Sequence, residues 1–543
     1  MKFDSILAEI NGFGKFQIAL VLIQILSRIT LPCHFLLNNF MAAVPSHHCN
    51  IDALDTGAVF GNLTLDQKLA VGIPAERDGT PSSCQMFSEP QYEYLLGSNS
   101  SKGSFTVQCQ NGWVYDKSTF KSTLATEWDL VCSRKGMNKA TATIFFIGVM
   151  VGAPVFGFLS DRFGRRPLLL VSYLASLIFA VLSAFSTSYV MFVILRFFTG
   201  MSLAGINVEW FSIEHRTFSG VIISLDWTIG NWILVGTAYF VNEWRKLILA
   251  VTSPLILSII AWRWLPESAR WLVAKGKTDA AHHYIMKCAK MNNRSKQKGG
   301  FVNEHSHYVS LTFSQTLLEC AETEHGAKKY TFVDLFRTPN IRKLAIYSGM
   351  LWFGVAFTYY GITLNITGFG LNPYLTQFIF ASIEMPMKIG VYYFLEKVGR
   401  KHGQMGSMLL TGLCLFINIF VPKDKWTVRT VVAVLGKSMS EASFTIMYLY
   451  TTELYPTVVR QNGLGYTSFL ARLGVSISPL IVLLEDLWHL LPAATYCAVA
   501  VGTGLVASLL PETLNTRLPE FIEDIEKPSP KSAKVLLSAI LPS

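Results

Sequence analysis

The sequence predicts an all-α membrane protein with twelve transmembrane helices. Hydrophobic residues make up 51% of its 543 residues and charged residues only 15%, whereas soluble domains carry about 25% charged residues. Apolar runs of the roughly 20 residues that cross a bilayer recur along the chain. Basic residues gather in the short connections between these runs. A bilayer, and not water, is therefore the main solvent of this chain.

The net charge of +10 does not indicate nucleic-acid binding. Its basic residues lie between apolar spans, as the positive-inside rule predicts, and not on one face of a soluble domain. The first apolar run, Phe16 to Leu26, follows Lys2 and Lys15 and resembles a signal sequence. No small-residue cleavage site follows and the run continues past Phe40, so we interpret it as a retained first helix.

The predicted spans also set the orientation of the chain. They lie at 16–40, 139–160, 167–186, 189–208, 219–240, 246–264, 343–364, 372–395, 404–421, 427–449, 462–485 and 490–510. The connections at 161–167 and 396–403 and the stretch 265–342 are rich in Lys and Arg, whereas the short loops near 187 and at 366–371 carry none. Both termini are therefore expected in the cytoplasm.

This orientation divides the chain into five regions. We expect a cytoplasmic N-terminus at 1–15, an N-terminal six-helix half at 16–264, a cytoplasmic central loop at 265–342, a C-terminal six-helix half at 343–510 and a cytoplasmic tail at 511–543. The first half contains a long extracellular loop at 42–138.

Four cysteines and two glycosylation sequons lie in the loop 42–138. The sequons begin at Asn62 and Asn99, and the cysteines are Cys49, Cys84, Cys109 and Cys132. This combination is typical of an oxidised, glycosylated extracellular loop. Four cysteines allow three pairings, and the sequence does not choose among them or exclude free thiols. As a working assignment we pair Cys49 with Cys109 and Cys84 with Cys132.

Paired motifs indicate that the two halves are related. Asp161-Arg-Phe-Gly-Arg-Arg166 follows the second span, and Glu396-Lys-Val-Gly-Arg-Lys401 follows the eighth. Glu209 precedes Arg216 by seven residues after the fourth span, as Glu453 precedes Arg460 after the tenth. Pro266-Glu267 after the sixth span matches Pro511-Glu512 after the twelfth. Three paired signals in the same order predict an internal repeat.

Two six-helix halves with charged, glycine-containing connections resemble the major facilitator transporters, whose halves rock about a site near the bilayer midplane. The stretch 157–166 is similar to the signature that follows their second helix. The resemblance implies that charged residues of these connections pair when the cytoplasmic side is shut. The expected gating residues are Asp161, Arg165, Glu209, Arg216, Glu453 and Arg460. The alternative is that these charges only fix topology.

Further motifs resemble the organic ion transporters of solute carrier family 22 over essentially the whole chain. They are Phe13-Gly-Lys-Phe-Gln17, the cysteine-rich loop, Pro266-Glu-Ser-Ala-Arg-Trp-Leu272 and Glu453-Leu-Tyr-Pro-Thr-Val-Val-Arg460. The stretch 366–377 looks most like the organic anion branch. This resemblance implies transport of small organic anions at the plasma membrane, basolateral in epithelial cells. It also implies exchange for a counter-anion such as a dicarboxylate or chloride, while a proton-coupled or facilitative cycle stays open.

Eight Asp, Glu, Lys and Arg residues lie in the interior of the predicted spans, away from their ends, where each costs roughly 3 kcal/mol to insert and so needs a partner or a task. They are Arg28, Arg196, Asp226, Glu384, Lys388, Lys437, Glu441 and Arg472, five positive and three negative. Glu384 and Lys388 are four residues apart, as are Lys437 and Glu441, so each pair can form on one helix face and be structural. Arg196 is assigned to helix packing, and Arg28 can pair with Asp226.

Arg472 is the best candidate for binding an anion. It lies in the middle of the span 462–485, with no acidic residue three or four positions away. A guanidinium can hold a carboxylate through two parallel hydrogen bonds. The alternative is a structural arginine bonded to helix carbonyls or to Asp226. In the resembled family, members of the anion branch have an arginine at the position of Arg472 and a lysine at that of Lys388. Cation carriers have an acidic residue at the position of Arg472.

The resemblance also nominates residues that line the central site. They are Trp227, Tyr359, Tyr360, Phe444 and Tyr448, together with Phe35 and Asn39 near the outer end of the first span. Flat rings suit varied aromatic substrates, and the Asn39 amide can donate to a carboxylate. Some anion carriers have an amide where Phe35 stands, which leaves the substrate range open. Ordinary helix packing is the alternative for each ring.

No phosphate-binding loop of the form G-x-x-x-x-G-K-[ST] is present, which argues against ATP-driven pumping. The histidines show no zinc-site spacing, and no cofactor or enzymatic activity is expected. Two other functions stay open. One is an organic cation or zwitterion carrier on the same scaffold, and the other is a non-transporting membrane receptor.

Overall fold

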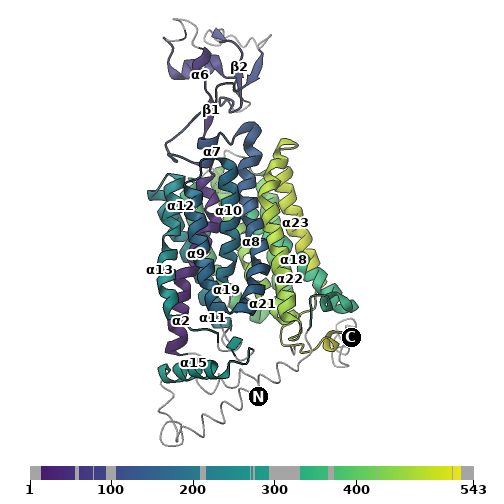
Figure 1. The fold of residues 1–543 in the computed structure, drawn as a ribbon. Helices are drawn as coiled ribbons and strands as arrows, with labels where there is room; N and C mark the ends of the chain where they lie inside the picture. Colours follow the sequence, from purple (N-terminus) through teal and green to yellow (C-terminus); the bar gives the residue numbers. More distant parts are fainter. Residues whose placement is uncertain are drawn as a thin grey trace, which may run out of the picture.

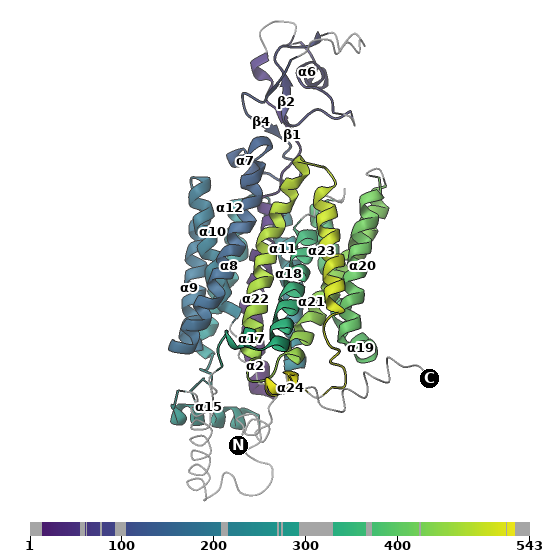
Figure 2. The same cartoon turned by 90° about the vertical axis from the view of Figure 1, so that its right-hand side faces the viewer.

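The structure is a computed structural model of the full chain. It describes residues 14–54, 60, 62–76, 79–92, 105–207, 216–268, 271–272, 275–292, 330–364, 372–422, 425–516 and 518–526. A bundle of long helices forms the body, with a small cysteine-rich module at one end and the short helices α15, α17 and α24 at the other (Figures 1 and 2).

The first half of the bundle contains the helices before residue 265. They are α2 (Lys15–Arg28), α3 (Thr30–Leu36), α4 (Asn38–Met41), α8 (Lys135–Phe163), α9 (Arg165–Ala184), α10 (Tyr189–Ala204), η4 (Gly205–Asn207), α11 (Arg216–Phe240), α12 (Trp244–Thr252), α13 (Pro254–Ala261) and η6 (Trp262–Trp264). Glycines bring α8 and α10 together. A Cβ on Gly148 or Gly152 would lie 2.1 or 2.2 Å from a backbone carbonyl oxygen of α10. Small residues four apart permit this close approach of membrane helices.

The second half contains α18 (Pro339–Thr363), α19 (Pro373–Val398), α20 (Arg400–Phe420), α21 (Trp426–Leu454), α22 (Arg460–Ile477), η9 (Ser478–Asp486) and α23 (Leu491–Ala507). Gly474 allows α22 to pack closely on α18, since a Cβ there would lie 2.5 Å from the Phe353 carbonyl oxygen. Helices α8 and α11 of the first half contact α22 and α19 of the second. These two contacts join the halves along the bundle.

Each predicted span coincides with one helix or with a run of consecutive helices. The first span is broken at Ile29 and Leu37, and the sixth at Ser253. Within the described residues, six helices are long and apolar enough to cross a membrane. The number of twelve crossings therefore stays a prediction.

The cysteine-rich module is held together by two disulfides, Cys49–Cys109 and Cys84–Cys132, which is the pairing of the working assignment. Two antiparallel strand pairs form its framework: β1 (His47–Cys49) pairs with β4 (Trp113–Tyr115), and β2 (Gln85–Phe87) with β3 (Thr106–Gln108). The short helices η1 (Asp52–Leu54), α6 (Leu65–Gly72), α7 (Leu124–Trp128) and η3 (Cys132–Arg134) complete it. Asn62 is exposed here, and Asn99 lies outside the described residues.

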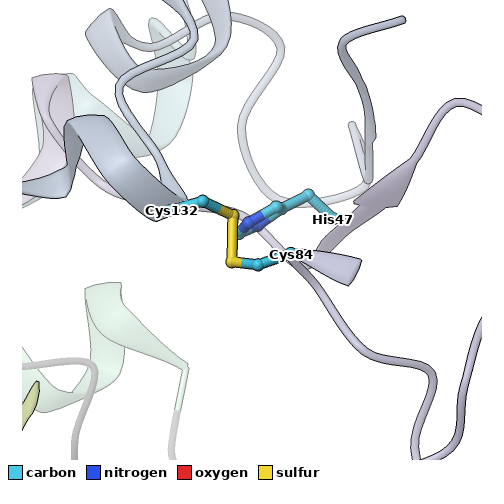
Figure 3. Close-up of side chains that lie close together, drawn as sticks. All are labelled: His47, Cys84 and Cys132. Carbon is cyan, nitrogen blue, oxygen red and sulfur yellow. A yellow bond between two sulfur atoms is a disulfide. The ribbon is translucent and has the colours of Figure 1, made fainter. Parts of the chain in front are cut away.

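His47 lies beside the Cys84–Cys132 disulfide (Figure 3). Their ligand atoms are within 4.8 Å of one another. Both sulfurs are bonded to each other, however, and metal binding requires free thiolates. The three side chains therefore do not form a metal site in this oxidised module.

The connections at the opposite end repeat between the halves. Gly164 and Gly399 both have positive φ, 103° and 89°, at the tight turns before α9 and α20. Glu267 accepts hydrogen bonds from the backbone N–H groups of Arg165 and Arg166. Glu512 accepts them from Arg400 and Lys401. Each glutamate thus caps the positive end of the helix that follows the turn.

The remaining helices lie at this same end (Figures 1 and 2). They are α15 (Thr278–Met291), α17 (Asp334–Arg337) and α24 (Glu523–Glu526). Glu526 accepts hydrogen bonds of 2.9 and 3.1 Å from the backbone N–H groups of Asn340 and Ile341. The part of the C-terminal tail that contains α24 is thereby fastened to the start of α18.

Candidate substrate site

A buried cluster of four charges lies between α19 and α21. Lys437 Nζ lies 2.9 Å from Glu384 Oε1, and Lys388 Nζ lies 3.4 Å from Glu441 Oε1 and 3.8 Å from Glu384 Oε2. The four residues are at most 6% exposed. Two positive and two negative charges balance, as burial in an apolar bundle requires.

The partners in this cluster differ from those predicted by spacing. Glu384 and Lys388 do approach each other along α19, but Lys437 pairs with Glu384 on the neighbouring helix, and no ion pair within 4 Å joins it to Glu441, a described residue. The local Lys437–Glu441 pair that the spacing permits is thus replaced by a pair between two helices. The i,i+4 rule considers residues of one helix only. Because α19 and α21 pack together, Glu384 on α19 lies closer to Lys437 than Glu441 on its own helix does.

Tyr359 connects this cluster to the aromatic side chains of the site. Its hydroxyl donates to Glu384 Oε1 at 2.7 Å, and Lys437 Nζ lies 3.2 Å from the centre of its ring. Trp227 Nε1 on α11 donates to the same hydroxyl at 3.3 Å. Tyr359 therefore links the two halves as well as the charges and rings.

Arg472 has no carboxylate partner within 4 Å among the residues that the structure describes. Its Nη1 donates to the Ser468 carbonyl oxygen at 3.3 Å and contacts Ser468 Oγ, both on its own helix α22. Tyr360 and Tyr448 lie close enough to interact with it electrostatically. Of the two structural alternatives, bonding to a helix carbonyl is present, while Asp226 is engaged elsewhere. Within the described residues, its hydrogen bonds involve Nη1 alone.

The two remaining arginines in the interior of the predicted spans both have partners within the first half. Arg28 Nε donates to Asp226 Oδ2 at 2.7 Å, which is the pairing the sequence allowed. Arg196 is 1% exposed. It donates to the His34 carbonyl oxygen at 3.3 Å and lies over the Phe145 ring at 4.5 Å. This environment agrees with the packing role assigned to Arg196.

The predicted aromatic residues form a continuous chain of contacts. Phe35 on α3 lies 5.8 Å from Trp227 between ring centres, and Tyr359 lies 5.2 Å from Phe444. Phe444 lies 5.6 Å from Tyr448, which is 58% exposed. Together with the Trp227–Tyr359 hydrogen bond, these contacts run from α3 to α21. The ring of Tyr360 joins from the side through Tyr359.

Further rings contact these aromatic residues and were not predicted from the sequence, among them Trp352 and Phe146. Trp352 on α18 lies 4.8 Å from Tyr448 and 5.6 Å from Phe444. Phe146 on α8 contacts both Phe35 and Tyr360. Neither carries a charge or a motif, so only their three-dimensional placement distinguishes them from other aromatic residues of the bundle.

The amide of Asn39 is not free to meet a substrate in this conformation. Its Nδ2 donates to the Thr363 carbonyl oxygen at 2.9 Å and to Gln377 Oε1 at 3.1 Å. Both acceptors belong to the second half. The N–H groups of Asn39 that were predicted to donate to a substrate carboxylate are therefore already used in hydrogen bonds that join the halves.

Comparison with known proteins identifies the chain. The sequence profile of the Sugar (and other) transporter family matches residues 91–524. Solute carrier family 22 member 7 of Rattus norvegicus is 42% identical over 98% of this chain and 100% of its own length. The Homo sapiens protein of that name is 44% identical over 97% of both. Solute carrier family 22 member 6 of Bos taurus is 38% identical, covering 97% of this chain and 95% of its own. The chain belongs to solute carrier family 22.

The family resemblance read from the sequence is thus confirmed. Within the organic anion branch, the motifs looked most like organic anion transporter 2, which is solute carrier family 22 member 7. This solute carrier family 22 chain is therefore a multi-pass membrane transporter and not an enzyme.

Solved structures show that the fold of this solute carrier family 22 member is that of the major facilitator superfamily. The inward open conformation of the xylose transporter XylE from E. coli has a TM-score of 0.58 at 17% identity, covering 74% of this chain and 92% of its own. The XylE proton:xylose symporter bound to 6-bromo-6-deoxy-D-glucose has a TM-score of 0.57 at 15% identity, over 92% and 97%. At these identities the likeness concerns the fold alone.

At the cysteine-rich end of this solute carrier family 22 fold, contacts join the two halves. Tyr374, at the start of α19, stacks on Phe40 of α4 with 5.4 Å between ring centres and lies 5.7 Å from Phe120. Its hydroxyl donates to the Thr119 carbonyl oxygen at 3.3 Å. An ion pair between Lys135 and Asp486 also crosses from one half to the other.

At the opposite end, the ion pair described for the expected gating residue Glu453 lies within the second half. Glu453 accepts from Arg400 Nε at 3.0 Å and Nη2 at 3.0 Å, inside the second half. Arg460 donates to the Tyr455 carbonyl oxygen. Asp161 is exposed, and its carbonyl oxygen accepts from Trp271. Glu209 and the side chain of Arg216 lie outside the described part, and Arg165 provides a backbone N–H to Glu267.

Arg400 is the gating candidate that the sequence analysis passed over. The internal repeat contained the signal, because Arg400 follows Gly399 as Arg165 follows Gly164. Placing the two halves in register would have nominated it alongside Arg165.

Proposed function

We propose that this transporter carries small organic anions across the plasma membrane by alternating access, in exchange for an intracellular anion. The observation that carries the proposal is the guanidinium of Arg472, which lies in a bundle helix without a carboxylate partner among the described residues. An uncompensated charge inside a membrane bundle is costly and marks a functional site by default.

The balance of buried charges favours an anionic substrate. The four charges around Lys388 cancel, and Arg28 and Asp226 cancel. The excess of two positive charges therefore resides on Arg196 and Arg472. Arg196 is enclosed by His34 and Phe145, so Arg472 is the cation that a substrate can approach. Its fork geometry suits a carboxylate or sulfonate.

Lys388 supplies a second, competing anchor. Its Nζ is shared between two carboxylates at 3.4 and 3.8 Å, which are longer than the 2.9 Å contact of Lys437. A substrate carboxylate can therefore displace Glu441 from Lys388 at a smaller loss than it would displace Glu384 from Lys437. Lys388 is the lysine of the cluster that we assign to substrate binding.

The series of contacting aromatic rings determines which organic anions fit the site. Rings from Trp227 to Tyr448 lie beside the charges, and Tyr448 is more than half exposed. Stacking on flat rings tolerates varied shapes, whereas directed hydrogen bonds would select one. We therefore propose amphipathic anions with an aromatic or alicyclic body and one acidic group.

The contacts between the halves support an alternating-access cycle. Asn39, Tyr374 and Lys135 tie the halves together at the cysteine-rich end. At the other end, the described ion pairs stay within one half, as Arg400–Glu453 does. We propose that the cysteine-rich end faces outside, that both termini are cytoplasmic, and that the site is open to the cytoplasm in this conformation. A basolateral location and glycosylation at Asn62 and Asn99 complete the proposal.

A competition uptake assay tests this function. Vesicles that contain the purified chain are preloaded with a dicarboxylate or chloride, and uptake of a labelled aromatic carboxylate is challenged with anionic, cationic and neutral compounds. We expect inhibition by anions alone and acceleration by the preloaded anion. Inhibition by cations would favour an organic cation carrier, and the absence of any uptake would favour a receptor. Uptake that the preloaded anion does not accelerate would refute only the proposed exchange, and not the transport of organic anions.

A further inference from the structure

A group of exposed cations surrounds the end of the first half that lies opposite the cysteine-rich module. We call it the basic rim and define it as Arg162, Arg166, Arg263, Lys277, Lys287 and Lys290. The rim runs from the turn between α8 and α9, past η6, to α15. All of its members are exposed except Arg166, which is half-buried.

Acidic side chains do little to neutralise the rim. Glu267 uses its carboxylate to accept hydrogen bonds from the backbone N–H groups of Arg165, Arg166 and Ser268. Arg166 itself donates to the Arg263 carbonyl oxygen at 3.3 Å. It has no carboxylate within 4 Å among the described residues. Asp161 and Asp279 are also exposed on these segments, but two carboxylates do not offset six cations, so the rim presents net positive charge to its surroundings.

Aromatic rings alternate with these cations. The Arg166 guanidinium lies 4.7 Å from the Trp262 ring, Arg162 lies 5.4 Å from Phe163, and Lys277 lies 5.6 Å from Trp271. Trp264 is 66% exposed. Aromatic and basic side chains at the ends of apolar helices are the composition that the headgroup layer of a bilayer selects.

Helix α15 extends this surface sideways. It lies across the end of the bundle, perpendicular to the long helices in both views (Figures 1 and 2). Ala281, Ile285 and Cys288 form its buried stripe, and Lys287 and Lys290 lie on its exposed side with Met286. An amphipathic helix with this orientation and these lysines suits the plane of a membrane surface.

The corresponding surface of the second half has a different charge. Arg400 is neutralised by Glu453, and the chain after α23 contributes Glu520, Glu523 and Asp524. Exposed cations of the second half at this end, such as Arg342 and Lys397, are thus accompanied by exposed carboxylates. The excess of positive charge therefore lies on the first half, and does not merely follow from the membrane topology that both halves share.

We propose that the basic rim binds the headgroups of anionic phospholipids in the cytoplasmic leaflet. Phosphate and carboxylate groups would pair with the rim cations, while Trp264 and Phe163 lie among the upper acyl chains. The inference rests on the orientation given under the proposed function, and it does not depend on the transported substrate.

Quenching of tryptophan fluorescence tests the proposal. The purified full chain is reconstituted in phosphatidylcholine vesicles that contain a spin-labelled lipid with either a serine or a choline headgroup. We expect the serine lipid to quench more strongly, and Trp264→Phe to remove much of that difference. Arg263→Gln with Lys277→Gln should lower the preference for the serine lipid by roughly five-fold per charge removed. High salt should lower it as well.

Matched variants make the outcome decisive. Arg342→Gln with Lys397→Gln removes one exposed arginine and one exposed lysine from the same end of the second half, and it should leave the lipid preference unchanged. Equal quenching by both lipids in the unmodified chain would overturn the proposal, as would an equal effect of the control pair. If the rim variant lowers uptake in cells but keeps its lipid preference in vesicles, a protein partner binds the rim and the lipid proposal fails. A lipid preference that persists in a chain without anion uptake would refute only the proposed function.

Discussion

Arg28 Nε donates a hydrogen bond of 2.7 Å to Asp226 Oδ2, and this pair keeps Asp226 from neutralising Arg472. Asp226 is the only acidic side chain inside the predicted spans of the first half. Because Arg28 holds it, the carboxylate that could have satisfied Arg472 from across the bundle is occupied. Arg472 instead bonds to Ser468 on its own helix.

Arg472→Ala should therefore reduce uptake of organic anions while the protein still reaches the cell surface. The substitution removes the anchoring charge but breaks no ion pair with a described carboxylate. Loss of a buried, hydrogen-bonded charge contact costs roughly 2–5 kcal/mol, so uptake efficiency should fall about 30-fold or more. Initial uptake rates, normalised to surface-biotinylated protein, measure this effect.

Two variants control for the Arg472 result. Arg472→Lys keeps the charge but loses the planar fork, so uptake should fall less than with alanine. Asp226→Asn leaves Arg28 unpaired and should instead lower folding yield. Uptake at the unmodified rate with Arg472→Ala at normal surface levels would rule out its role in anion binding.

Glu441→Gln should raise the affinity for anionic substrates. Glu441 is the nearer of the two carboxylates that share Lys388. Its neutralisation removes the competitor of the substrate and adds one positive charge to the cluster. We expect KM to fall by roughly ten-fold or more, which corresponds to about 1.5 kcal/mol, the lower end of measured couplings between close charges. The concentration dependence of uptake measures KM.

The matched variant Glu384→Gln separates this effect from simple loss of a buried charge. Glu384 accepts from Tyr359 and pairs with Lys437. Its substitution leaves a buried lysine unpaired, which costs about 3–5 kcal/mol, so surface expression should fall. A KM that is unchanged or raised in Glu441→Gln would contradict the assignment of Lys388.

The sequence predicted the helices and the family more completely than it predicted side-chain partners. Apolar runs and loop charges need no partner to be recognised, so each predicted span coincides with a helix or a run of helices. Lys437 shows the limit. Its spacing to Glu441 suggested a local pair, and the packing of α19 against α21 directs it to Glu384 instead.

Asn39 and Trp352 show why the site was predicted only in part. Family resemblance nominated Asn39 as a substrate contact, but in this conformation its amide joins the halves through Thr363 and Gln377. A moving transporter gives one residue different partners in different states. Trp352 has no charge and no motif, so only contacts with Phe444 and Tyr448 reveal it.

Tyr374→Ala should open the cysteine-rich end. The ring stacks on Phe40, and its loss removes the stacking together with the bond to Thr119. Aromatic pairs contribute about 0.5–1.5 kcal/mol beyond their buried area, which would raise the open population several-fold. We would measure it as the rate at which an impermeant maleimide, added outside cells, labels Gln377→Cys.

Tyr392→Ala serves as the comparison for Tyr374→Ala. Tyr392 lies on the same helix, is 44% exposed and contacts Tyr393. Its loss should leave the labelling rate unchanged. Equal rates in the two variants would show that Tyr374 does not hold the end closed.

Asn62→Gln and Asn99→Gln test the orientation of the bundle. If the cysteine-rich end faces outside, each asparagine can receive a glycan and each substitution should lower the apparent mass in cells. Neither residue belongs to the substrate site, so KM should not change. A mass that is unchanged by both substitutions and by glycosidase treatment would remove the support for this orientation.

Glu512 should make the stability of the second half depend on pH. Burial alone would raise the pKa of its carboxyl, but backbone N–H donors from Leu514, Arg400, Thr513 and Lys401 outweigh it and hold the pKa below its ordinary value. A carboxylate with a lowered folded-state pKa stabilises the protein above the unfolded pKa of about 4.3. That stability is lost as pH falls through the folded value.

Glu512→Gln should therefore lower the free energy of unfolding by about 1 kcal/mol at neutral pH, as loss of a helix cap does, and weaken the dependence of Tm on pH below about 4.3. Thermal unfolding of the detergent-purified chain across this range measures both quantities. Glu396→Gln is the control, because Glu396 is exposed near the end of α19 and has no ion pair in the described part. If Glu396→Gln changes Tm and its pH dependence as much as Glu512→Gln does, the helix cap is not the cause. The carboxylate of Glu512 would then contribute only its charge, which the solvent screens at both positions.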